Sequence, residues 1–314
     1  MTAVIHAARA SIALGSKSFA LASRLFDQRT RDLATLLYAW CRHADDIIDG
    51  QASGHGIVEY VATPAERLAA LEADTRSALA GMPPDSMPFQ ALAQVVEATN
   101  MPLRYPLDLI EGFRIDVEER PFVTFDDTLT YCYHVAGCVG VMMAIVMGVS
   151  PDDRETLDRA SDQGIAFQLN NIARDVIEDA MNSRRYIPDD WLAEVGLTPA
   201  HYSFPKHRRQ LARLVTRLVD EAERYEASAR YGTAALSTRS AWAVLAASRI
   251  YGDIGRLVRD GGAEALENRV VTSRAAKLKA VIASYPQALS RAKSWPRPGP
   301  SRDGLWSFPS GVLP

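Results

Sequence analysis

The sequence predicts an all-α fold organised as one helical domain, and three observations indicate this fold class. Alanine, leucine, arginine and glutamate dominate, and apolar residues recur at steps of three and four, as on one face of an α-helix. The alternating apolar and polar runs that β-strands require are missing from the sequence. With 314 residues, of which 47% are apolar, the chain is long enough to bury a sizeable core.

Glycine and proline mark the breaks between the expected helices. Residues 183–208 contain Pro188, Pro199 and Pro205, which predicts a long and partly ordered connection. Shorter breaks are expected at residues 50–56, 81–88, 102–106 and 121–127.

The end of the chain differs from the rest in composition. After residue 291 it is rich in proline, glycine and serine, with Trp295 and Trp306 among them. Such a segment has little apolar surface to bury. We therefore expect a helical domain over residues 1–291 and a loosely ordered tail over residues 292–314.

Net charge, cysteine spacing and the length of the uncharged apolar run indicate which partners and surroundings to expect. The formal net charge is −3 and the basic residues are spread along the chain, so we expect no nucleic acid partner. Cys41, Cys132 and Cys138 lack metal-binding spacing, which favours reduced thiols in a cytoplasmic protein. The uncharged run 135–150 is shorter than the roughly 18 residues of a membrane span. We interpret it as a core helix and leave peripheral membrane contact and the oligomeric state open.

The first informative segment, residues 36–50, reads LLYAWCRHADDIIDG. At about 100° per residue, Asp45 and Asp49 lie one turn apart, and Tyr38 and Arg42 precede them on the same side. Carboxylates at this spacing repel one another and weaken an isolated helix. Because most other positions are apolar, the acidic residues form a narrow stripe on a core helix.

A second stripe lies in residues 167–179, which read FQLNNIARDVIED. Gln168, Asn171, Asp175 and Asp179 follow one another at steps of three and four, so they share one helical face. The other faces are mainly apolar. The chain therefore contains two mainly apolar helices that each carry a line of oxygen ligands.

A solvated polar face is the ordinary interpretation of a single acidic stripe. Here the surroundings are apolar and the pattern occurs twice, so unpaired burial of these carboxylates would be costly. Mg²⁺ takes oxygen ligands, often one or two carboxylates together with substrate phosphate. Two stripes that face one another across a cavity would hold a diphosphate through bridging metal ions, and we favour this interpretation.

Basic residues accompany both stripes. Arg42 lies one turn before Asp45, Arg174 is next to Asp175, and Lys17 lies in the segment GSKSF. Each could form an internal salt bridge. The functional alternative is that they bind diphosphate oxygens and stabilise the negative charge that grows on a leaving diphosphate.

These segments resemble the squalene and phytoene synthase family. YAWCRHADDIID at residues 38–49 is similar to its first aspartate motif, and QLNNIARDVIED at 168–179 is similar to its second. DVEER, YCYHVAGCVG, GSKSF, RRYIP and SRIYGDIG also match family blocks in the correct order. One departure is Ser183, because the family usually has glycine before the arginine of the GRxYLP block.

The resemblance implies an isoprenoid-synthase-type helical domain around a deep apolar cavity. It implies site residues that act in catalysis (Arg42, Asp45, Asp49, Asp175 and Asp179), bind metal (Asp45, Asp49, Asn171, Asp175 and Asp179), or bind substrate diphosphate (Ser16, Lys17, Ser18, Tyr38, Arg42, Gln168, Arg174, Tyr251 and Arg269). For Arg269 a surface arginine is an equally good interpretation.

The implied reaction is a Mg²⁺-dependent head-to-head condensation, with Mn²⁺ as an alternative ion. One prenyl diphosphate ionises, the second attacks the allylic cation, and a cyclopropyl diphosphate forms and then rearranges. The carbocations need a dry apolar wall, which residues 135–147 could supply, with Phe19, Tyr38 and Tyr251 as π faces.

The wording of the first motif and the chain length are most similar to bacterial phytoene synthases. This implies geranylgeranyl diphosphate as substrate, phytoene as product for carotenoid biosynthesis, and no need for NADPH. The alternatives are a dehydrosqualene or squalene synthase that uses farnesyl diphosphate, a head-to-tail prenyltransferase, and a non-catalytic lipid-binding or assembly protein of the same fold.

Overall fold

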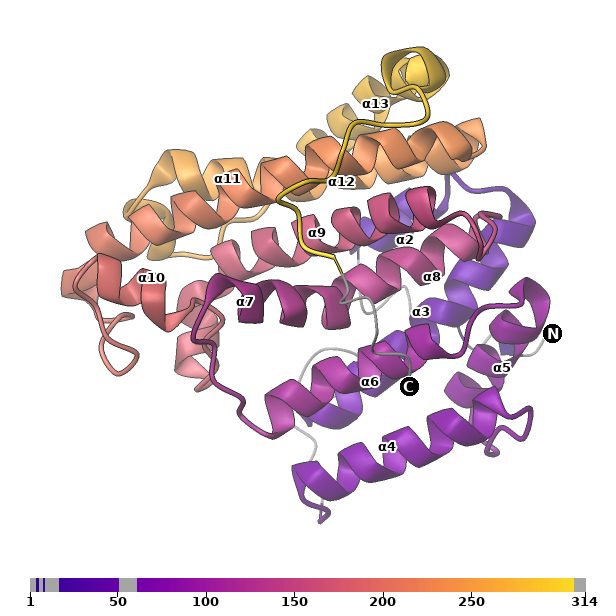
Figure 1. The fold of residues 1–314 in the computed structure, drawn as a ribbon, viewed down its shortest axis with the longest axis horizontal. Helices are drawn as coiled ribbons and strands as arrows, with labels where there is room; N and C mark the ends of the chain where they lie inside the picture. Colours follow the sequence, from indigo (N-terminus) through magenta and orange to yellow (C-terminus); the bar gives the residue numbers. More distant parts are fainter. Residues whose placement is uncertain (1–3, 6–7, 9–16, 51–60, 308–314) are drawn as a thin grey trace.

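The computed structural model describes residues 4–5, 8, 17–50 and 61–307. In these ranges the regular structure is helical, which confirms the predicted all-α fold (Figure 1). The α-helices are α2 (Lys17–Ser23), α3 (Gln28–Asp49), α4 (Pro64–Leu79), α5 (Met87–Thr99), α6 (Arg104–Val117), α7 (Phe125–Cys132), α8 (Cys138–Val146), α9 (Arg154–Met181), α10 (Asp189–Glu194), α11 (Arg208–Gly232), α12 (Thr238–Gly261) and α13 (Arg274–Ser294). A π-helical turn, η1 (Tyr133–Gly137), joins α7 to α8, and the 3₁₀ turns are η2 (Pro205–His207), η3 (Thr233–Ala235) and η4 (Glu264–Leu266).

Helix α9 lies at the centre of the fold. Its 28 residues span about 42 Å, and it packs against α8, α11 and α12. Helices α3 to α6 lie on the far side of α8, and α13 lies outside α12 (Figure 1). The space between α9 and the N-terminal helices is therefore bounded by elements from both halves of the chain.

Two glycines allow α9 to approach α8 and η1 closely. A Cβ atom on Gly164 would lie 2.7 Å from the Cα atom of Gly137 and still closer to the carbonyl oxygen of Ala136. On the facing segment, a Cβ atom on Gly140 of α8 would clash with the backbone of Ala160 in α9. Larger side chains would force these two backbones apart, so the glycines determine how closely α9 packs against α8 and η1.

Both acidic stripes lie at the C-terminal ends of their helices. Helix α3 begins at the N-cap Asp27, which accepts a hydrogen bond from the Thr30 backbone, and it ends where Gly50 turns into the left-handed region. Asp45, Asp46 and Asp49 thus occupy its last turns, where the helix dipole disfavours negative charge. Asp175 and Asp179 occupy the same place in α9. Other groups must offset this unfavourable placement.

The apolar run 135–150 begins within η1 and continues into α8, and most of its side chains are buried. One helical segment, Phe125–Val146, is long and apolar enough to cross a membrane, with a mean hydropathy of 1.7. Because 67% of that window is buried within the fold, we interpret it as a core helix.

The connection over residues 183–208 is more ordered than we expected. It contains α10 and η2, and Trp191 is buried and stacks on Phe125 with ring centroids 4.4 Å apart. The indole of Trp191 also lies under the guanidinium of Arg217, 3.8 Å away. Aromatic packing, which the proline count did not reveal, holds this connection against the domain.

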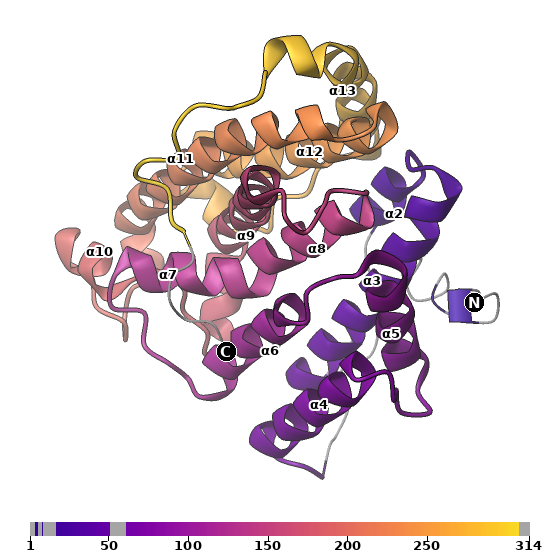
Figure 2. The same cartoon turned by 45° about the vertical axis from the view of Figure 1, so that its right-hand side comes forward.

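The described part of the tail differs from the loose segment that we expected. Residues 297–306 run from α13 across α11 and α9 towards α7 (Figure 2). Arg302 forms an ion pair with the buried Asp162 of α9, and Trp306 is itself buried. Polar anchoring compensates for the small apolar surface that made the segment look disordered.

The close approach of α9 to η1 predicts the effect of a single methyl group. Gly164→Ala is expected to lower the free energy of unfolding by at least about 2 kcal/mol, because the backbones must separate. Gly81→Ala is the matched control: its site is open, and only the positive φ of 79° costs about 1 kcal/mol. Urea denaturation measures both, and equal losses would contradict the close-packing argument.

Candidate active site

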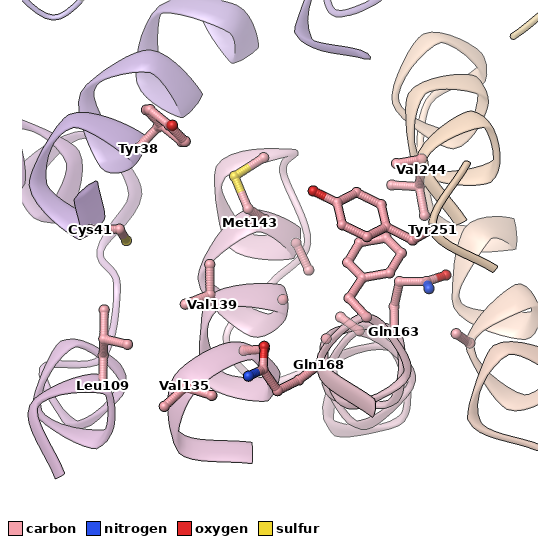
Figure 3. A pocket seen from close by; sticks show the side chains of 18 of the residues that line it. Tyr38, Cys41, Leu109, Val135, Val139, Met143, Gln163, Gln168, Val244 and Tyr251 are labelled. Carbon is pink, nitrogen blue, oxygen red and sulfur yellow. The ribbon is translucent and has the colours of Figure 1, made fainter. Parts of the chain in front are cut away.

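A cavity of about 460 Å³ lies between α9 and the N-terminal helices, and mainly apolar side chains line it (Figure 3). Figure 3 shows Val135, Val139 and Met143 on one wall and Tyr251 and Val244 on the opposite side. This agrees with the expectation that residues 135–147 form an apolar wall. The lining includes seven of the predicted site residues: Tyr38, Arg42, Asp45, Asp49, Gln168, Asn171 and Tyr251.

The α3 stripe faces this cavity, and arginines compensate its charge. Asp45 forms an ion pair with Arg42 one turn earlier. Asp49 forms an ion pair with Arg184, which follows the end of α9. Arginine thus offsets the unfavourable position of these carboxylates at the end of the helix.

The α9 stripe is divided between the cavity and its rim. Gln168 and Asn171 line the cavity, and the Asn171 amide lies 3.4 Å from the Gln168 amide oxygen. Asp175 lies outside the lining and is bound by two arginines. Arg174 donates to both of its oxygens, and the Arg269 Nε is 2.9 Å from Oδ1. The structure therefore brings Arg269 to the second stripe, which its sequence position alone did not indicate.

Two carboxyl groups of the stripes have strongly raised pKa values. Burial raises the pKa of Asp45 to about 6, with Arg42 opposing the shift and Asp49 adding to it. Burial and the neighbouring Asp175 raise the pKa of Asp179 to about 7, although Arg184 opposes this. The nearby cations thus compensate the negative charge only in part, so the stripes would gain from a further cation.

Asp116 of α6 is a cavity residue that sequence reasoning missed. It accepts hydrogen bonds from the hydroxyls of Tyr131, at 3.0 Å, and Tyr186, at 3.2 Å. These two rings stack with their centroids 4.5 Å apart. Burial raises the Asp116 pKa to about 6, and Arg184 and the two tyrosines oppose the shift. The DVEER match was the signal that could have drawn attention to it.

Arg184 is the second missed residue. It lines the cavity, forms the ion pair with Asp49, and opposes the rise in the pKa values of Asp116 and Asp179 that burial causes. It therefore acts on carboxylates of α3, α6 and α9 together. Its place in RRYIP was visible in the sequence, but its three partners come from distant segments.

Aromatic rings border the apolar part of the cavity. Tyr251 of α12 stacks on Phe167 of α9, with ring centroids 4.4 Å apart. Tyr38 of α3 lies on the other side of the cavity (Figure 3). Two of the three predicted π faces therefore reach the cavity, and the third, Phe19, lies in α2 with a side chain outside the described set.

The predicted N-terminal contacts lie outside the described side chains. Ser16 lies outside the described residues, and Lys17 and Ser18 begin α2 with side chains that are not described. The end of α2 does reach the cavity, because Ala22 lines it.

The donor set of the two stripes fits a divalent cation in part. Within the described ranges, no three His, Cys, Asp or Glu side chains lie together as a ready-made metal site. Mg²⁺ commonly takes one or two carboxylates and completes its shell with water and substrate phosphate. Oxygen donors on α3 and α9 that border one cavity suit this kind of binding, in which the substrate contributes to the site.

Comparisons with known proteins agree with this geometry. The sequence profile described as Squalene/phytoene synthase matches residues 12–276. The 15-cis-phytoene synthase of Paracoccus sp. (strain N81106 / MBIC 01143) is 49% identical over 310 residues, which cover 98% of this chain and 99% of that protein. The 15-cis-phytoene synthase of Pantoea ananas is 46% identical over 95% of this chain and 96% of that protein.

Solved structures show the same fold. A dehydrosqualene synthase crystallised with a ligand superposes with a TM-score of 0.79 and 25% identity, over 94% of this chain and 98% of that one. The squalene synthase HpnC from Alicyclobacillus acidocaldarius gives a TM-score of 0.73 at 23% identity, over 83% of this chain and 94% of that one.

The chain belongs to the squalene/phytoene synthase family. Membership implies an enzyme that acts on prenyl diphosphates and depends on a divalent metal ion.

The raised pKa of Asp116 predicts how stability changes with pH. The folded state binds more protons than the unfolded state between the ordinary pKa of 3.8 and about 6, so stability falls as pH rises through this window. We expect Asp116→Asn to reduce the loss of unfolding free energy between pH 5 and pH 7 by about 1–2 kcal/mol.

Urea denaturation at the two pH values measures this difference. Asp126→Asn, at an exposed residue in the first turn of α7, is the control and should leave the pH dependence unchanged. Parallel curves for the wild type and Asp116→Asn would contradict the prediction.

Proposed function

We propose that this protein is a 15-cis-phytoene synthase, which joins two molecules of geranylgeranyl diphosphate head to head through a cyclopropyl diphosphate intermediate. The observation that carries the proposal is the pair of oxygen-donor stripes on α3 and α9 at one deep apolar cavity. The product class is supported by relatives of that name at 46–49% identity over almost the whole chain.

Two sets of residues would bind the diphosphates. Bound Mg²⁺, or Mn²⁺ in its place, would neutralise charge on the diphosphate as its bond to carbon breaks. Arg42 and Gln168 line the cavity and would contact the oxygens of the diphosphate, with Arg174 and Arg269 at the rim. Ser16, Lys17 and Ser18 are proposed to complete this shell. The proposed metal ligands are Asp45, Asp49, Asn171, Asp175 and Asp179.

The arginine–carboxylate pairs suggest how the site would change on binding. Arg42 and Arg174 each pair with a proposed metal ligand, so metal binding to Asp45 and Asp175 would release both guanidinium groups for the diphosphate. This exchange of partners would provide carboxylate ligands for the metal ion and guanidinium donors for the diphosphate. Bidentate guanidinium donors suit phosphate oxygens well.

The chemistry proceeds in the apolar part of the cavity. The first carbon–oxygen bond breaks, and the diphosphate leaves with the bonding electrons. The double bond of the second substrate attacks the allylic cation, and loss of a proton closes the cyclopropane ring. Loss of the second diphosphate drives rearrangement, and loss of a last proton gives the central double bond. The walls of α8 and η1 exclude water, and Tyr38 and Tyr251 offer π faces to the cations.

Product analysis tests this function. Purified protein incubated with geranylgeranyl diphosphate and Mg²⁺, without NADPH, should release a hydrocarbon with a conjugated triene spectrum. Asp45→Asn and Asp175→Asn should reduce turnover at least about a thousandfold while helical content is unchanged, because each replaces a charged metal ligand by a neutral amide and leaves an arginine without its ion-pair partner.

The controls separate the alternatives. Turnover of farnesyl diphosphate alone would favour a dehydrosqualene synthase, and a requirement for NADPH would favour a squalene synthase. No turnover with either substrate would favour the non-catalytic alternative. Asp74→Asn, on α4 and outside the cavity lining, should retain full activity. Near-normal activity in Asp45→Asn or Asp175→Asn would overturn the proposed metal site.

We also propose that this protein is cytoplasmic and binds the surface of an anionic bilayer through α13. Within the described residues, α13 presents an apolar ridge of Leu278, Ile282, Tyr285 and Leu289, which are 44–63% exposed. The 21 residues of α13 include five Lys or Arg and no Asp or Glu, so the helix is strongly basic in a chain of net charge −3. An apolar ridge on a basic helix is complementary to an anionic lipid surface.

A small depression lies beside this ridge. Arg24, Arg239, Trp242 and Tyr285 contribute to its lining, and the rings of Trp242 and Tyr285 are 4.9 Å apart. Two arginines beside two aromatic rings suit the phosphate and glycerol region of a lipid. Ala22 and Phe26 at the α2–α3 junction line the cavity near this face. A hydrocarbon product would therefore be released close to the bilayer.

Vesicle binding tests this surface. Leu278→Gln combined with Ile282→Gln is expected to weaken binding to phosphatidylglycerol vesicles at least about tenfold, since burial of one such side chain contributes about 1.5–3 kcal/mol. Leu103→Gln is the matched control, because Leu103 is 46% exposed at the start of α6, away from α13 (Figure 1). Equal binding by all three proteins would contradict the proposal, as would equal binding to neutral vesicles.

A further inference from the structure

A buried polar network joins the tail to the core of the domain. Asp162 of α9 is 0% exposed and accepts two hydrogen bonds from Arg302, at 2.9 and 2.6 Å, and one from Ser228. Ser228 of α11 in turn accepts from the Arg159 Nη1, at 2.5 Å. A buried carboxylate is stable only with such partners, so this network fixes residue 302 firmly to α9 and α11.

The residues on either side of Arg302 are held as well. The Trp306 ring lies 4.9 Å from the ring of Tyr133, and its backbone N–H donates to the Tyr225 hydroxyl at 2.9 Å. On the other side, the carbonyl of Pro300 accepts from the Arg159 Nη2. We call residues 297–306 the C-terminal strap.

Arg159 of α9 contacts the strap and also lines the cavity. It lines the cavity, yet it is only 3% exposed and both of its terminal nitrogens donate to groups of the network. Its charged end is thus held by Ser228 and Pro300, while its aliphatic carbons remain as the surface offered to the cavity. Long cationic side chains often separate their two ends in this way.

Arg159 lies at the end of the cavity remote from the acidic stripes. It precedes Asn171 by twelve positions on α9, which corresponds to about 18 Å along the helix axis. Ala160, Gly164 and Phe167 line the cavity between these levels at steps of four and three, and Thr156 lines the same end as Arg159. A chain of four isoprene units can extend this far, whereas a chain of three units ends short of Arg159.

We propose that the C-terminal strap fixes Arg159 as the end wall of the prenyl cavity and thereby sets the preference for the longer prenyl chain. The inference rests on the proposed function, since it concerns the site that would hold geranylgeranyl diphosphate. Asp162 and Arg302 are positioning residues, because they act on the substrate only through Arg159, the wall that they hold.

Loss of the strap would change the end of the cavity in a specific way. The guanidinium of Arg159 would lose the Pro300 carbonyl, and Asp162 would lose its cationic partner. Both groups would then require water, which would enter where the last isoprene unit must pack. A shorter chain would not reach this region, so its binding would be unaffected.

The test compares the binding of two unreactive substrate analogues by the full chain in the presence of Mg²⁺. Geranylgeranyl and farnesyl thiolodiphosphates differ by one isoprene unit, and the ratio of their Kd values reports the end of the cavity. Arg302→Met removes the ion pair, and Gly299→Val places atoms against Arg159 and Tyr231, where a Cβ would already lie 2.9 and 3.1 Å from them. Each variant is expected to reduce the preference for the longer analogue at least about tenfold, with farnesyl binding within about twofold of the wild type.

Arg297→Met is the matched control. Arg297 belongs to the strap and pairs with Asp153 at the surface, away from the cavity lining, so its loss should leave the ratio unchanged. An unchanged ratio in both Arg302→Met and Gly299→Val would overturn the inference, as would equal weakening of both analogues. Binding does not require turnover, so a wild type that makes no phytoene would refute the proposed function while this ratio still decides the role of the strap.

Discussion

The structure depends on how negative charge is held at the C-terminal ends of two helices. Asp45 and Asp49 end α3, and Asp175 and Asp179 end α9, in positions that the helix dipoles disfavour. Arginines from three segments offset this cost, and the raised pKa values of Asp45 and Asp179 show that compensation is partial. Such a site favours the binding of a further cation, and in the proposed mechanism a metal ion would displace its arginines towards the diphosphate.

The apolar half of the cavity depends on a different constraint, which is backbone contact. Gly164 and Gly140 let the backbones of α9 and the α8–η1 segment approach closely, so the two segments form one closely packed wall. Phe167 lies on the same helix as Gly164, and Tyr251 of α12 stacks on Phe167. Helix α9 therefore contributes both to the end of the cavity that carries the carboxylates, which we call the mouth, and to the apolar wall behind it.

The sequence was sufficient for features that repeat with the helical period. The stripes of α3 and α9, the apolar wall and the all-α fold depend on spacing within one segment, and spacing is visible in the sequence. Asp116 and Arg184 were not assigned to the site, and the tail was predicted to be loosely ordered, because their partners lie far away: Asp116 meets Tyr186 and Arg302 meets Asp162. A proline-rich tail has few apolar residues, so the buried ion pair of Arg302, together with the buried Trp306, explains why its described part is ordered.

At both ends of the cavity, an arginine that lines the cavity is held by neighbouring polar groups. An arginine lines each end: Arg184 near the carboxylates of the mouth, and Arg159 at the opposite end. A free guanidinium would be strongly hydrated and would bring water to carbocations that water must not reach. Asp49 holds the first arginine, whereas Ser228 and Pro300 hold the second. In the proposed mechanism the mouth exchanges its partners when substrate and metal bind, and its pairs are partly exposed. The far end must never exchange them, and its network is accordingly buried under the C-terminal strap.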